Sequence, residues 1–186
     1  MIKRNKDGNI ERITFGEQEF MFNGTGPRVY AKNDSDLKMS LKVSEACNHV
    51  LLHIRVENTS DTRVHPGKIS VYLGVDCYMD RYPDWNRKLF PTLMRCEPTH
   101  FWGYFMSPEG QILGVASPEP FPAYSLLYNG RGHRIDSVEL DIINSDSALK
   151  RCSGCMTSLG PYEVIERDIF LFPVDCLDDL ERSANE

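Results

Sequence analysis

Apolar and polar side chains alternate every second residue along most of the chain. The clearest case is LKMSLKVS at 37–44, where Leu37, Met39, Leu41 and Val43 alternate with lysines and serines. Because successive side chains of a strand point to opposite faces, this pattern predicts a strand with one buried face. The same period predicts further strands at 9–15, 19–24, 49–58, 69–76, 100–106, 111–117, 123–129, 133–144 and 163–174.

A helical period is missing before residue 175, and the tail 175–186 (DCLDDLERSANE) is the exception. There Asp175 or Cys176 can cap a short helix that has acidic residues in its first turn. Many short strands without helices indicate an all-β fold, and a chain of 186 residues is long enough for one core. We therefore predict a two-sheet antiparallel β-sandwich over 1–174, followed by a helical tail that is a linker or the start of a missing helical domain.

The stretch from 100 to 117 is predicted to be a hairpin. Its Ser107-Pro108-Glu109-Gly110 segment has Pro at the second turn position and Gly at the fourth, which is typical of a type I turn. We expect the following side chains to be buried in the core: Leu41, Leu52, Ile54, Leu73, Phe101, Phe105 and Phe170.

The aromatic strand HFWGYFM has two different faces. Alternation places Phe101 and Phe105 toward the core and His100, Trp102 and Tyr104 on the other face. That second face is amphipathic, and its polar tips need partners. It can pack against a neighbouring sheet or domain, which is the simpler interpretation, or it can stack sugar rings. The candidate residues for such a surface, including loop residues near it, are Tyr82, Trp85, Arg95, His100, Trp102 and Tyr104.

The amino-acid composition argues against some classes of binding partner. The net charge is −6, and lysines and arginines are scattered rather than gathered in a stripe, which argues against binding to nucleic acid. No apolar run is long enough for a membrane span. The start, MIKRNKDGNIERITF, lacks the apolar region of a signal peptide. The chain is therefore expected to be cytosolic, or a mature or excised piece whose signal has been removed.

Candidate chemistry is sparse. Cys152 and Cys155 form one CxxC, which lacks the second ligand pair of a zinc site and the context of a thioredoxin motif, so we expect no structural metal and no cofactor. Asp76, Asp80 and Asp84 are spaced by four residues, and paired carboxylates carry glycoside hydrolysis. Their loop is rich in Pro and Asp, as solvated loops are, and no partner acid can be placed. We assign no catalytic residue.

Three segments together resemble a known family: GVDCYMDRYPDWNRKLFPTLMRCEPTHFWGYFMSPEGQILGVASPEPFPAYSLLYN, GHRIDSVELDIIN and SLGPYEVIERDIFLFPV. They are similar to the N-terminal β-sandwich, of the galactose-mutarotase-like or supersandwich type, of large bacterial six-hairpin glycosidases and polysaccharide-degrading enzymes. The resemblance covers about residues 37–175. It departs from the family at 160–163, where Gly-Pro-Tyr-Glu stands in place of the end of a Leu-x-Pro-Gly-Glu turn.

The resemblance implies an ancillary, non-catalytic domain that supports a catalytic (α/α)6 barrel and can line one edge of its substrate cleft. The parent protein would be a glycoside hydrolase or polysaccharide lyase of the periplasm or cell envelope. In this family the barrel holds most catalytic residues, so none is carried onto this chain.

Two alternatives from other classes stay open. One is a free-standing carbohydrate-binding module that uses the His100-Trp102-Tyr104 face. The other is a small epimerase-like enzyme in which His100, His133 and Glu97 are the acid/base candidates. A binding module should hold glycan as an isolated chain, whereas a supporting domain should expose an apolar patch.

Overall fold

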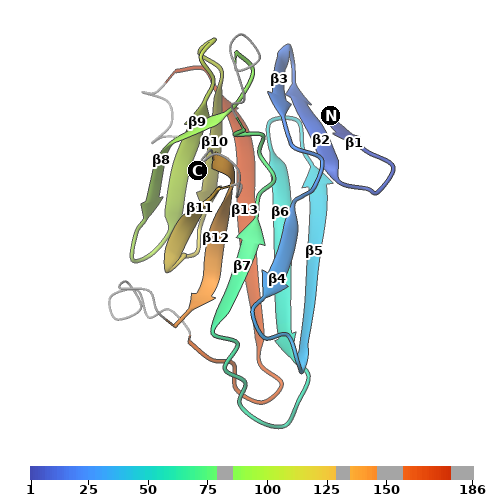
Figure 1. The fold of residues 1–186 in the computed structure, drawn as a ribbon, viewed down its shortest axis with the longest axis vertical. Helices are drawn as coiled ribbons and strands as arrows, with labels where there is room; N and C mark the ends of the chain where they lie inside the picture. Colours follow the sequence, from blue (N-terminus) through green and yellow to red (C-terminus); the bar gives the residue numbers. More distant parts are fainter. Residues whose placement is uncertain (79–85, 129–134, 146–156, 177–186) are drawn as a thin grey trace.

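The computed structural model describes residues 1–78, 86–128, 135–145 and 157–176 (Figure 1). The described residues contain strands and loops and no helix, which confirms the all-β prediction. The strands are β1 Ile2–Arg4, β2 Ile10–Phe15, β3 Gln18–Met21, β4 Arg28–Ala31, β5 Leu37–Glu45, β6 Val50–Asn58, β7 Lys68–Tyr72, β8 Phe90–Cys96, β9 Phe101–Met106, β10 Ile112–Ser117, β11 Ala123–Tyr128, β12 Ile135–Asn144 and β13 Val164–Val174.

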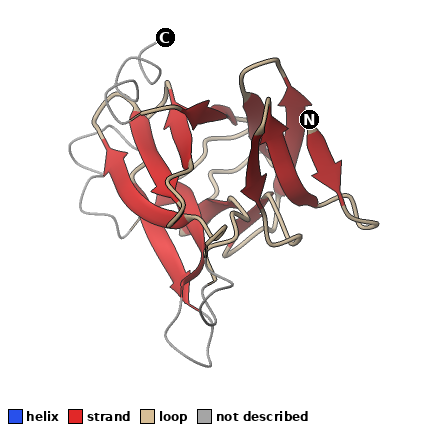
Figure 2. Ribbon diagram, turned by 90° about the horizontal axis from the view of Figure 1, so that it is seen from above, coloured by secondary structure: helices blue, strands red, loops and turns tan. Residues whose placement is uncertain are grey.

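These strands form antiparallel sheets around one main core. A six-stranded sheet of order β5-β6-β13-β10-β9-β8 faces a four-stranded sheet of order β11-β12-β7-β4, as a sandwich does (Figure 2). A small sheet, β1-β2-β3, lies beside the sandwich. It is tied to the end of β5 by Glu45, which accepts a hydrogen bond from the Ile2 amide (3.0 Å) and pairs with the Met1 ammonium (3.3 Å).

The β9–β10 hairpin forms as predicted. Met106 lies opposite Ile112, and the Gly110 amide donates to the Ser107 carbonyl at 2.9 Å. Gly110 has a φ of 87°, a value that favours glycine. Inner and outer positions alternate along β9, so Phe101 and Phe105 are fully buried while Trp102 and Tyr104 are half-buried.

The core is mostly as expected. Leu52, Ile54, Leu73, Phe101 and Phe105 are each 0% exposed. Two expectations were wrong. Leu41 is only half-buried because β5 is the edge of its sheet, and Phe170 is half-buried because the alternation of β13 turns it to the outer face.

Strands β1, β4 and β8 were not predicted. β4 and β8 are edge strands with several exposed positions, so they lack a clean apolar alternation, and Pro91 interrupts β8. The strand predicted at 69–76 ends at Tyr72, because Gly74 takes a φ of 76° and its backbone packs against that of Gly26.

Some predictions fall outside the described residues. They concern Tyr82, Trp85, His133, Cys152, Cys155, the aspartates 80 and 84, and positions 177–186 of the expected helical tail. In the part of the chain that the structure describes, no helix has the length and apolar character needed to cross a membrane.

Candidate functional site

The outer face of the six-stranded sheet, the face turned away from the main core, carries a row of side chains centred on Trp102. In the strand register Trp102 lies opposite Arg95 on β8 and Ala116 on β10, and Ala116 lies opposite Phe170 on β13. The Arg95 guanidinium sits 5.8 Å from the centroid of the Trp102 ring, and it also pairs with Glu97 at 2.8 Å. The indole ring of Trp102, with the planar guanidinium of Arg95 beside it, therefore lies near the β8 edge of this face.

Next to this row, along β9, β10 and β13, the outer face of the sheet is apolar. Phe172 lies over the backbone of Gly114, where an added Cβ would come within 2.4 Å of the Phe172 ring. The cluster is separate from the main core. We call it the outer patch, and its members are Trp102, Tyr104, Met106, Ile112, Ala116, Phe170, Phe172 and Val174.

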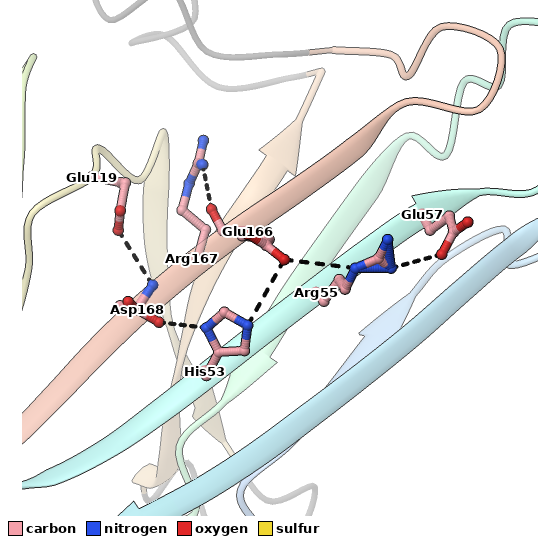
Figure 3. Close-up of polar contacts among 7 residues, drawn as sticks. All are labelled: His53, Arg55, Glu57, Glu119, Glu166, Arg167 and Asp168. Carbon is pink, nitrogen blue, oxygen red and sulfur yellow. Dashed lines mark hydrogen bonds and ion pairs between the residues drawn. The ribbon is translucent and has the colours of Figure 1, made fainter.

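Charged side chains occupy the other half of the same face, on β6 and β13 (Figure 3). His53 Nδ1 lies 2.7 Å from Asp168 Oδ1, and His53 Nε2 lies 3.9 Å from Glu166 Oε1. Arg55 Nε is 3.6 Å from the same Glu166 oxygen, and Arg55 Nη1 is 2.7 Å from Glu57 Oε2. We call these five residues the polar ladder.

The polar ladder is held by its own members and by the backbone. Glu119 Oε2 accepts a hydrogen bond from the Asp168 amide at 3.2 Å, and Arg167 donates to the Glu166 carbonyl at 2.8 Å (Figure 3). Asp168 orients the His53 ring as a carboxylate orients a catalytic histidine, but the second ring nitrogen faces Glu166 instead of an open position. Exposed pairs of this kind contribute about 0–1 kcal/mol each. The ladder is best described as an ordered polar surface.

The structure brings some of the predicted site residues together. Arg95, Trp102 and Tyr104 share the outer face. His100 lies in the turn before β9, where its Nδ1 is 3.0 Å from Thr99 Oγ1. Glu97 is paired with Arg95, and its amide donates to the His100 carbonyl at 3.0 Å, so these two acid/base candidates are neighbours in the turn whose side chains have different partners.

The described residues contain no candidate metal site, and the buried thiol of Cys77 is not a candidate nucleophile. No group of three His, Cys, Asp or Glu side chains there could hold a metal ion. Burial, and then the charge of Asp76, raise the pKa of the Cys77 thiol far above its usual range, so this thiol is unreactive.

A cavity of about 350 Å³ opens beside the small sheet, lined by Lys3, Glu11, Arg12, Met21, Phe22, Asn23 and Gly24. Its two cations are already paired, Lys3 with Glu11 at 3.2 Å and Arg12 with Glu19 at 2.9 Å. It offers no unpaired charge to a ligand.

A second polar cluster, which was not predicted from the sequence, lies on the four-stranded sheet. Glu139 and Asp141 on β12 are 2% and 0% exposed. Both contact Lys68 of β7, and Tyr30 of β4 contacts Glu139. In the sequence these acids alternate with Val138 and apolar neighbours, which is also the pattern of a solvated strand face, so their burial is not visible there.

Comparison with known proteins shows a similarity in fold but no match in sequence family. No protein-family model and no curated protein matches the chain. A solved structure titled as a polysaccharide lyase is similar, with a TM-score of 0.63 and 13% sequence identity. The similar region covers 93% of this chain and 26% of the other. The chain thus spans about a quarter of that protein's length and shares its β fold over that part.

Proposed function

We propose that this chain is an ancillary, non-catalytic β-sandwich domain of a polysaccharide-degrading enzyme, and that its outer patch packs against the rest of that enzyme. The likeness to about a quarter of a polysaccharide lyase supports a modular role. The sequence resemblance supports a sandwich of the galactose-mutarotase-like type placed before a catalytic (α/α)6 barrel. The observation that carries the proposal is the outer patch itself.

The outer patch has the anatomy of an interface. A sheet of a free sandwich usually has one solvated polar face, yet here the second face holds a tryptophan, two phenylalanines and a methionine. Aromatic residues and methionine are enriched in the centres of protein interfaces, and charged residues surround them. The patch follows this plan, with Arg95 and Glu97 near the β8 edge and the polar ladder on the other side.

A carbohydrate-binding module is the second candidate. Trp102 favours it, because an aromatic ring flanked by the Arg95 guanidinium and the Glu97 carboxylate offers a stacking surface beside polar groups. Phe170 lies two strands away from Trp102, at about 10 Å, so a second ring is available to an extended glycan. Such a ligand would bind weakly, since one or two stacked rings must offset the cost of immobilising a flexible chain.

The test compares Trp102→Lys with Val164→Lys. Val164 lies on β13 of the same sheet, is 39% exposed and is outside the patch, so it serves as the control. The parent chain should bind a hydrophobic dye and self-associate with rising concentration. Trp102→Lys should lower both effects severalfold, whereas Val164→Lys should leave them unchanged. Equal behaviour of the two variants would contradict the docking role.

The same proteins separate the alternatives when incubated with a panel of polysaccharides. Saturable quenching of tryptophan fluorescence that Trp102→Ala abolishes, without product release, would favour the binding module. Turnover that His100→Ala or Glu97→Gln abolishes would overturn the non-catalytic proposal. We expect neither quenching nor turnover.

A further inference from the structure

The four-stranded sheet contains two buried carboxylates that share one lysine. Glu139 and Asp141 are two residues apart on β12, so their side chains lie on the same face, and they are 2% and 0% exposed. The Lys68 ammonium contacts the carboxyl group of Glu139 and lies 3.2 Å from Asp141 Oδ1. If both acids of this carboxylate cluster are ionised, Lys68 balances one of the two negative charges, and no other described residue pairs with the second.

The two acids are not equivalent. Asp141 accepts hydrogen bonds from Ser70 Oγ at 2.8 Å and from Asn144 Nδ2 at 2.6 Å, and such bonds favour a charged carboxylate. Glu139 is contacted by the Tyr30 hydroxyl and by Lys68. Burial first, and then the charge of Asp141, raise the pKa of Glu139 to about 7. The proton of the pair therefore belongs to Glu139.

Among the residues that the structure describes, the other neighbours of Glu139 do not supply a second positive charge. Tyr72 of β7 lies opposite Glu139, and its hydroxyl lies 3.3 Å from Asp136 Oδ2. The Arg28 guanidinium of β4 stacks 4.2 Å above the Tyr72 ring and donates to the Thr25 carbonyl at 2.5 Å. From β11, the residues opposite Glu139 and Asp141 are an uncharged serine and an alanine.

Tyr30 connects this cluster to the edge of the sheet. It lies on β4, a strand of four residues that pairs with β7 and with no other described strand. Its hydroxyl reaches across β7 to Glu139 on β12, so the contact holds the edge strand to a strand that is not its neighbour. Tyr30 is 37% exposed, so water can reach the cluster when this side chain moves away.

We propose that Glu139 holds β4 in place in a protonation-dependent manner: the protonated carboxyl keeps the Tyr30 contact closed, and ionisation opens the contact and loosens the edge strand. Ionised Glu139 is a second buried anion beside Asp141, and admitting water at the Tyr30 side relieves that cost.

The direction of the pH effect follows from the raised pKa. Between the ordinary value of 4.5 and about 7, the closed state keeps a proton that the open state loses. Closing therefore binds a proton, so the closed state is favoured at low pH and is progressively lost as the pH rises through this window.

The experiment is amide hydrogen exchange of the full chain at pH 5.5 and pH 8.5, corrected for intrinsic exchange rates. The opening constant of Arg28–Ala31 should rise on the order of tenfold at the higher pH relative to Val50–Asn58 of β6. Glu139→Gln keeps a neutral side chain of the same shape and should abolish this rise. Glu57→Gln, which removes an acid from the polar ladder, should keep it.

Equal opening of β4 at both pH values in the parent chain would overturn the proposal, and so would a rise that persists in Glu139→Gln. If Glu139→Gln does not fold, Tyr30→Phe gives a second reading, because it keeps the carboxyl and removes the contact. This variant should show weak protection of β4 at both pH values. Protection equal to that of the parent at pH 5.5 would overturn the role of the Tyr30 contact.

Discussion

Phe101→Ala should lower the free energy of unfolding by about 3–5 kcal/mol, as the loss of a buried phenylalanine does. The Phe101 side chain is 0% exposed on the inner face of β9. Its ring packs edge to face against Phe121, with 5.6 Å between the ring centroids. The alanine would leave a cavity inside the sandwich. Urea denaturation followed by circular dichroism measures the change.

Trp102→Ala is the matched control for this prediction. Trp102 is the next residue on the same strand, points to the outer face and is half-buried. It should cost clearly less than Phe101→Ala, because its removal opens a surface position instead of a closed cavity. Equal losses in the two variants would mean that the outer patch is packed as tightly as the core, which would contradict its role as a docking face.

Asn58→Ala should destabilise the chain by about 2–4 kcal/mol, although the residue lies at the end of a strand. The Asn58 side chain is 0% exposed. Its Nδ2 donates to the carbonyls of Thr62 and Gly160, both at 2.7 Å, and its Oδ1 accepts from the Ser60 amide at 3.0 Å. The alanine would remove these three hydrogen bonds, and each contributes about 0.5–1.5 kcal/mol net.

Asn33→Ala serves as the control, because Asn33 is exposed in the loop between β4 and β5. It should change stability by less than about 0.5 kcal/mol. The urea denaturation midpoints of the two variants, each compared with that of the parent chain, test both predictions. A midpoint of Asn58→Ala close to that of the parent would show that the remaining donors, Ser60 Oγ to the Thr62 carbonyl and the Glu163 amide to the Gly160 carbonyl, are sufficient.

The sequence predicted well the strands that separate two different environments. The alternation at 37–44 and 49–58 became β5 and β6, because one face of each strand meets the core and the other meets water. The edge strands β4 and β8 were missed, since their exposed positions break the apolar alternation that marks a strand in a sequence.

The candidate site could be predicted only in part. Alternation shows that Trp102 and Tyr104 share a face, and the short turn between β8 and β9 brings Arg95 beside them. It does not show that Phe170 joins them, because β10 and β13 are far apart in the sequence and their register is set by the whole sheet. The burial of Glu139 depends in the same way on Lys68 and Tyr30, which come from distant strands.

The central place of β13 also has a consequence for folding during synthesis. β13 pairs with β6 on one side and with β10 on the other, so it joins two parts of the six-stranded sheet that otherwise share no ladder. A ribosome must therefore complete Val164–Val174 before this sheet can close. Until then β6 and β10 have open edges that invite pairing with other chains. We expect slow folding limited by these distant pairings, and protection of the nascent chain by a chaperone should raise the yield of soluble protein.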